Sequence, residues 1–182
     1  MTMHALIRSA VLALAIQQAA SLTAELAAQG AKGAARPSNP ACALVTEKDV
    51  EAATGLDYGP GEHYDELNVR VGEKAICVWT VHELPEIGVE FFPARAGSGH
   101  TETLAKVKPR AECTREPVRG VGDRAFAETC RGPISKASVY ARTGRSDVAV
   151  TVYLKPGQSL ATPIKAVAIA LAKAAAARAK NT

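Results

Sequence analysis

Aromatic side chains are scarce in this sequence: phenylalanine, tryptophan and tyrosine together make up 4% of its 182 residues. Alanine, valine, isoleucine and leucine must therefore form most of the core, and they bury less area per residue than aromatic rings do. We expect covalent cross-links to help stabilise such a core. The chain is nonetheless 47% hydrophobic and 22% charged, which is a globular composition and excludes a disordered one.

The apolar run near the N-terminus is far shorter than the ~20 residues that cross a membrane as a helix. This run, Ser9–Ile16, follows Arg8 and precedes small residues, with a plausible cleavage site at Leu26-Ala27-Ala28. A positive residue, a short apolar run and a small-residue site are the parts of an export signal. We interpret residues 1–28 as a signal peptide; the alternative is an amphipathic helix that stays in the mature protein.

Residues 29–41 contain mainly glycine, alanine, proline, serine and asparagine, which is typical of a flexible leader. The remaining length fits one domain, which we place at 42–182. No lipid-anchor cysteine directly follows the apolar run, and Asn39-Pro40-Ala41 before Cys42 is a poor lipidation context. We therefore expect a periplasmic or secreted protein without a transmembrane span.

Closely spaced cysteine pairs are missing as well. The cysteines are Cys42, Cys77, Cys113 and Cys130, and this spacing lacks the Cys-x-x-Cys pairs of zinc sites, so we expect no metal and no cofactor. An even number of cysteines after an export signal favours two disulfides. Three connectivities are possible. We prefer Cys42–Cys77 with Cys113–Cys130; the second bond would close a strand–turn–strand unit and contribute about 3 kcal/mol in the chain-entropy model.

Helix and strand patterns follow one another along the domain. The expected elements are helix 46–55, strands 75–82 and 87–91, helix 98–107, strands 113–118, 125–130, 135–142 and 148–154, and a helix capped by Thr162 with Pro163 in its first turn. In the first helix, Thr46 and Asp49 have the spacing of a capping box, and Gly55 is typical of a helix end. In the second helix, Leu104 and Val107 are expected to face inward.

The strands mostly succeed one another as hairpins, and the two around Thr143-Gly144-Arg145-Ser146 form the clearest one. We predict an α+β fold, an antiparallel sheet of about five to six strands with three helices packed on it. A parallel dinucleotide-binding sheet is excluded because strands and helices do not alternate. Trp79, beside Cys77 on a central strand, is expected to be a core residue.

Several motifs occur in a recognisable order: Cys42-Ala43-Leu44-Val45-Thr46, an acidic helix ending at Gly55, Cys77-Val78-Trp79, and Gly120-Val121-Gly122-Asp123-Arg124-Ala125-Phe126, followed by a hairpin and an alanine-rich helix. Over residues 42–178 the chain resembles a family of exported bacterial domains of unknown function, common among actinobacterial lipoproteins. The resemblance implies a helix–sheet sandwich similar to the Mog1/PsbP-like folds and a Cys42–Cys77 bridge, and it implies no reaction. The missing lipid-anchor cysteine is a departure from the family.

The net charge of +4 favours encounter with anions, and segment 106–131 is rich in cations. Arg115, Arg119 and Arg124 are therefore candidate anion-binding residues; the alternative is an edge strand whose charges prevent strand pairing. Nucleic acid is not an expected partner, because aromatic side chains do not interleave with the basic ones. The Gly120-x-Gly122 pair is expected to be a turn and not a phosphate loop, because a strand follows it.

No Gly-x-Ser-x-Gly elbow occurs, and nothing in the sequence joins a nucleophile to a base. The leading hypothesis is a non-catalytic exported module that binds a small ligand, an envelope component or a protein partner. The rival is a hydrolase without a recognisable motif, which would need His63, His82 or His100 beside a carboxylate and a hydroxyl.

Overall fold

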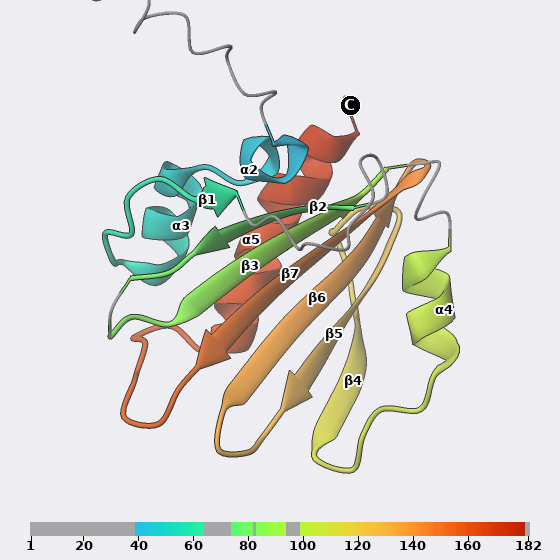
Figure 1. The fold of residues 1–182 in the computed structure, drawn as a ribbon. Helices are drawn as coiled ribbons and strands as arrows, with labels where there is room; N and C mark the ends of the chain where they lie inside the picture. Colours follow the sequence, from blue (N-terminus) through green and yellow to red (C-terminus); the bar gives the residue numbers. More distant parts are fainter. Residues whose placement is uncertain (1–38, 64–73, 82, 94–98, 181–182) are drawn as a thin grey trace, which may run out of the picture. The chain divides into compact units, whose positions relative to one another are not determined.

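The computed structural model of the protein describes residues 39–63, 74–81, 83–93 and 99–180. They form the predicted α+β fold, with the strands in one antiparallel sheet of order β1-β2-β3-β7-β6-β5-β4 (Figure 1). The strands are β1 (Glu62–His63), β2 (Ala75–Trp79), β3 (Glu86–Phe92), β4 (Cys113–Val118), β5 (Arg124–Cys130), β6 (Ser135–Thr143) and β7 (Ser146–Leu154). The helices are α2 (Pro40–Leu44), α3 (Glu47–Thr54), α4 (His100–Lys106) and α5 (Ile164–Ala179). Within these ranges, no helix has the length and apolar character of a membrane span.

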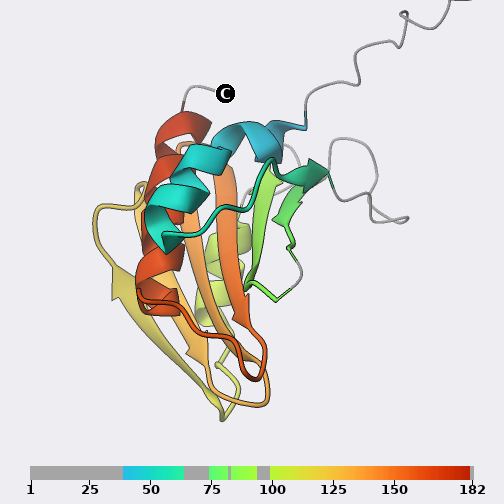
Figure 2. The same ribbon diagram turned by 90° about the vertical axis from the view of Figure 1, so that its left-hand side faces the viewer.

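One face of the sheet carries the core. Helix α5 lies against β6 and β7 on this face, and α2 and α3 lie beside α5 (Figures 1 and 2). The sheet contributes alternate residues of each strand, such as Val139 of β6 and Val150 of β7, both fully buried. Trp79 is 2% exposed and belongs to this core, as predicted. A side chain at Gly61 would clash with both Trp79 and Cys77. The backbone at this position therefore packs so closely against these two core side chains that it requires glycine.

The first predicted helix is confirmed as α3. The Thr46 hydroxyl accepts a hydrogen bond from the Asp49 N–H, and the Asp49 carboxylate accepts one from the Thr46 N–H, completing the capping box. The Asp49 carboxylate also accepts hydrogen bonds from Arg178 near the end of α5 at 2.7 and 3.1 Å. A contact between a helix start and a residue more than a hundred positions later thus joins the two ends of the domain.

The end of the predicted leader is wrong, because Asn39–Ala41 belong to the folded domain. The Asn39 side chain accepts a hydrogen bond from the Ala41 N–H and caps the short helix α2, and its amide nitrogen donates to the carbonyl of Ile76 at 2.6 Å. Ala41 is fully buried. The predicted signal peptide and the leader up to residue 38 lie outside the described residues.

Two helix details differ from the prediction. Val107 was expected to face inward but follows α4 and is 55% exposed, since α4 lies on the polar face of the sheet and has Thr101 as its buried residue. Thr162 does not cap α5: Pro163 is the N-cap residue, and no side chain hydrogen-bonds to the first turn.

Both preferred disulfides are present, Cys42–Cys77 and Cys113–Cys130. The first ties α2 to β2. The second joins opposite residues of the β4–β5 hairpin, as expected for a strand–turn–strand unit.

Strand β4 forms an edge of the sheet. The Arg131 N–H donates to the carbonyl of Glu112 at 3.0 Å, which makes Glu112 and Arg131 a hydrogen-bonded pair of the β4–β5 ladder. Because hydrogen-bonded and non-hydrogen-bonded pairs alternate along an antiparallel ladder, the next pair, Cys113 and Cys130, is non-hydrogen-bonded. Every second residue of β4 from Cys113 onward therefore directs its N–H away from β5. Pro117 occupies one of these positions, where its missing N–H leaves the pairing with β5 intact.

The Gly120-x-Gly122 segment is a turn followed by β5, as predicted. Gly122 has a φ of 56°, and a Cβ there would clash with the carbonyl oxygen of Arg142. The Asp123 N–H donates to that carbonyl at 2.7 Å, and the Asp123 side chain accepts from the Gly144 N–H at 2.6 Å. The turn is therefore fitted against the β6–β7 turn.

Replacing Gly122 with alanine should destabilise the protein by about 3 kcal/mol, because both the left-handed φ and the clash with a backbone carbonyl oppose a side chain. Gly120→Ala is the matched control: its φ is 72°, but its Cβ meets no atom within 4 Å. The control should lose about 1 kcal/mol. Urea unfolding measures both, and equal losses would contradict the proposed fit between the two turns.

Acid should weaken the contact between α3 and α5. Burial acts to raise the pKa of Asp49, but hydrogen bonds from Arg178 and Thr46 outweigh it and hold this pKa below its ordinary value. The stabilisation is therefore complete above the unfolded value of about 3.9 and is lost as the pH falls through the lower folded value. Asp49→Asn should be about 1 kcal/mol less stable than wild type at pH 7. The difference should shrink in urea unfolding at pH 3, and a pH-independent difference would contradict this account.

Candidate functional site

An open hollow of about 550 Å³ lies beside the Cys113–Cys130 disulfide. We call it the hairpin hollow. Its lining residues are Arg110, Glu112, Cys130, Arg131, Gly132, Pro133, Ile134, Lys136 and Tyr153. They come from the segment before β4, the end of β5, the β5–β6 turn, and the adjoining parts of β6 and β7. The volume falls within the range of about 300–1,000 Å³ that is usual for small-ligand pockets.

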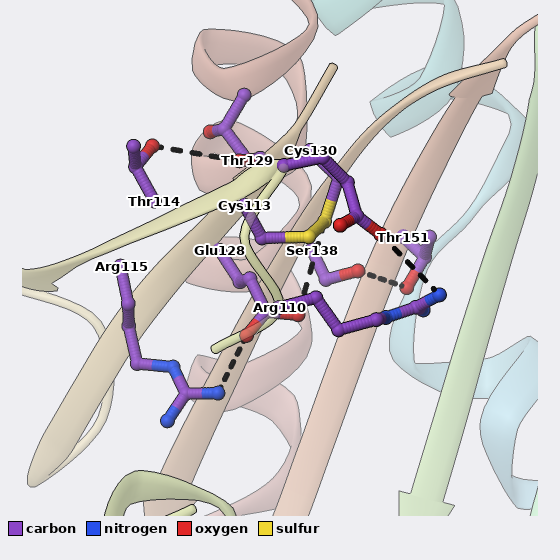
Figure 3. The surroundings of a disulfide bond; sticks show 10 residues. Arg110, Cys113, Thr114, Arg115, Glu128, Thr129, Cys130, Ser138 and Thr151 are labelled. Atoms are coloured by element: carbon purple, nitrogen blue, oxygen red, sulfur yellow. Dashed lines mark hydrogen bonds and ion pairs between the residues drawn. A yellow bond between two sulfur atoms is a disulfide. The ribbon is translucent and has the colours of Figure 1, made fainter. Parts of the chain in front are cut away.

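The two sides of the hairpin hollow are tied together. The disulfide joins β4 to β5, the Arg131 N–H donates to the Glu112 carbonyl, and the Cys113 N–H donates to the Arg110 carbonyl at 2.9 Å. Figure 3 shows Arg110 beside the disulfide, with Glu128, Ser138 and Thr151 nearby on the sheet. A site whose walls are fixed in this way loses little conformational entropy when a ligand binds.

The sheet register supplies the floor of the hollow. Cys130 lies opposite Lys136, Lys136 opposite Tyr153, and Tyr153 opposite Glu86, so these side chains form one row across four strands. Burial, together with the Glu86 and Glu90 carboxylates, raises the pKa of the Tyr153 phenol. The phenol is therefore a hydrogen-bond donor at neutral pH.

The next row of the same sheet face holds small polar side chains. Ser138 and Thr151 are opposite each other and share a hydrogen bond of 2.9 Å between their hydroxyls. Gly88 follows on β3, and a Cβ added there would meet no atom within 4 Å. No described residue therefore covers the sheet face at Gly88.

Arg115, a candidate anion-binding residue, is engaged within the protein. Its guanidinium forms an ion pair with Glu128, donates to the carbonyls of Leu104 and Val107 at 2.6 and 2.7 Å, and lies 4.7 Å from the ring centre of Phe126. These contacts hold the end of α4 on the sheet.

The other two candidates, Arg119 and Arg124, are exposed at the turn end of the β4–β5 hairpin, whereas the hairpin hollow adjoins its disulfide end. The structure thus does not gather the three arginines into one site. Whether Arg119 and Arg124 bind anions remains a prediction. Two other cations of the predicted basic segment, Arg110 and Arg131, do come together at the hollow.

The start of α4 carries a second group of polar residues. Arg142 pairs with the buried Asp147 at 3.0 Å and with Glu102 at 3.8 Å, and the Asp147 carboxylate accepts from the His100 N–H at 3.1 Å. Among the described residues, one oxygen each of Thr101, Glu102 and Asp147 is buried and finds no hydrogen-bond partner. The ion pairs and the hydrogen bond of this group anchor α4 on the sheet.

Of the three histidines that a hydrolase would need, His100 has a described side chain, and it does not line the hollow. The His100 ring stacks on Phe92, with 4.1 Å between ring centres. The side chain of His63 and the whole of His82 lie outside the described part of the chain. His63 itself pairs with Cys77 as part of the short strand β1.

Cys113, Glu128 and Cys130 place potential metal-ligand atoms within 4.8 Å of one another. Both sulfur atoms belong to the disulfide and are therefore not thiolates, the form that binds metal.

Lys136, Ile134 and Tyr153 are site residues that were not predicted from sequence. A signal for two of them was present. Thr143 pairs with Ser146 across the predicted hairpin turn, and counting seven residues outward along each strand places Lys136 opposite Tyr153.

Comparisons with protein-family models, with curated proteins and with solved structures found no match to this chain. The assignment of a function therefore depends on the geometry of the site.

Replacing Arg115 with alanine should destabilise the protein by about 2 kcal/mol, because it leaves Glu128 largely buried without its partner and frees two carbonyls at the end of α4. Amides of α4 should also exchange hydrogen faster. Arg124→Ala, on the exposed end of the same hairpin, is the control and should change stability by less than about 0.5 kcal/mol. Similar losses in urea unfolding for the two variants would refute a structural role for Arg115.

Proposed function

We propose that this protein is a non-catalytic binding module that works outside the cytoplasm, and that the hairpin hollow holds its ligand. The observation that carries the proposal is the construction of the hollow: cationic and apolar side chains line a space of about 550 Å³ beside a disulfide that ties its sides together. A small number of polar groups in a preformed, partly apolar concavity is the usual composition of a ligand site.

The location of the protein is part of the proposal. Two disulfides favour an oxidising compartment, and the interpretation of residues 1–28 as a signal peptide agrees with periplasmic or secreted protein. We also propose that the chain is related to the exported actinobacterial domains that it resembles, and that the same sandwich architecture serves binding in both.

A non-catalytic role is favoured over a hydrolase by the positions of the described groups. The hollow holds a tyrosine, a lysine, two arginines and the Glu112 carboxylate, and its cysteine is in a disulfide. It lacks a described hydroxyl or thiolate nucleophile paired with a base, which nucleophilic hydrolysis requires.

The proposal is tested by titrating the ¹⁵N-labelled protein with a panel of sugars, amino acids, cations, carboxylates and short amphiphiles while recording amide shifts. At least one member should give saturable shifts at residues 110–112, 131–136 and 153. A neighbouring hollow of about 320 Å³ shares Cys130 and Arg131 with the hairpin hollow, so the internal reference is the part of it away from these residues, at Leu160, Thr162 and Ile164. Saturable shifts confined to that part, or no saturable shift from any member, would contradict the proposal.

A further inference from the structure

The cations of the hairpin hollow outnumber its anions. Arg110, Arg131 and Lys136 face a single carboxylate, that of Glu112, which lies 3.6 Å from Arg110 in an exposed pair of little strength. Among the residues that the structure describes, Arg131 and Lys136 have no ion-pair partner. An anionic group in the hollow would therefore gain charge-assisted hydrogen bonds without first breaking strong ones.

The same hollow contains an apolar surface. Ile134 is 51% exposed and lies beside Pro133, although a large aliphatic side chain gains free energy when it is covered. The disulfide and the Tyr153 ring extend this surface. An apolar group bound here would remove Ile134 from water.

The charges are distributed unevenly along the floor. Lys136 and Arg131 lie toward β5, whereas Glu86 lies on β3, opposite Tyr153 at the other end of the row. The Glu86 carboxylate would repel a second negative charge at that end. A ligand charged at one end only therefore fits this arrangement better than a dianion does.

We infer that the hairpin hollow binds a small amphiphile that carries one anionic head group, with the head at Arg131 and Lys136 and the apolar body on Ile134 and Tyr153. This inference rests on the proposed function and adds the chemical class of the ligand.

Octanoate is the probe, and two molecules that each lack one of its features are the comparisons: octanol has the chain without the charge, and acetate has the charge without the chain. In amide-shift titrations octanoate should bind at residues 131–136 and 153, about tenfold more tightly than octanol. Acetate should not saturate in the same range. Octanol binding as tightly as octanoate, or acetate binding as tightly, would overturn the inference.

Variants separate the two parts of the ligand. Lys136→Met keeps most of the apolar stem and should weaken octanoate about tenfold while leaving octanol unchanged. Lys173→Met, at an exposed position of α5, is the matched control and should change neither affinity. Equal weakening of octanoate by both variants would show a non-specific charge effect and would refute the site.

The remaining outcomes distinguish the inference from the proposed function. If a neutral or cationic member of the wider panel binds the hollow more tightly than octanoate, the inference is wrong and the proposed function stands. Sedimentation with vesicles of phosphatidylglycerol tests the other source of an anionic head group. Binding to these vesicles without binding of monomeric octanoate would also overturn the inference.

Discussion

Helix α5 packs on the sheet mainly through small side chains, among them Ala168, Ala172 and Ala175, which are fully buried. An alanine ends at Cβ, so the helix backbone lies close to the strands, and valines of β6 and β7 fill the remaining space. Packing of this kind depends on accurate placement of the backbone, because an alanine side chain has no rotamers with which to adapt to a gap. The contact between Arg178 and Asp49 and the Cys42–Cys77 disulfide secure the elements around α5.

The use of one sheet face for this core determines the character of the other face. Helices α2, α3 and α5 supply the apolar cover, and α4 is held on the opposite face mostly by polar contacts from Arg115, Arg142 and Asp147. Because α4 covers only part of that face, the region beside the second disulfide stays open. The hairpin hollow therefore lies where the sheet has polar side chains and where none of the described helices covers them.

Much of this architecture was predictable from local patterns. The capping box of α3, the hairpin before and after Gly144 and the disulfide across β4 and β5 each depend on residues close in sequence. The predicted end of the leader was wrong because the Asn39 side chain hydrogen-bonds to the carbonyl of Ile76, a partner that composition does not reveal. The prediction for Val107 was wrong because it placed an apolar residue at a helix end toward the core, and the core lies on the other side of the sheet from α4.

In the candidate site, one pairing was predictable from the sequence and one grouping of residues was not. Once Cys113 is opposite Cys130, counting two residues inward on each strand places Arg115 opposite Glu128, so its pairing could have been foreseen. The grouping of Arg110 with Lys136 and Ile134 could not, because it requires the path of the segment before β4, which neither periodicity nor turn residues specify.

Pro117 has a consequence for the behaviour of the protein in a crowded compartment. Of the outward-directed positions on β4, Cys113 uses its N–H within a turn and Pro117 has none, which leaves Arg115 as the single backbone donor that an incoming strand could meet. Edge-to-edge polymerisation needs a continuous ladder of donors and acceptors. This edge of the sheet is thus a poor template for fibril growth, even though β4 pairs with a strand on one side only.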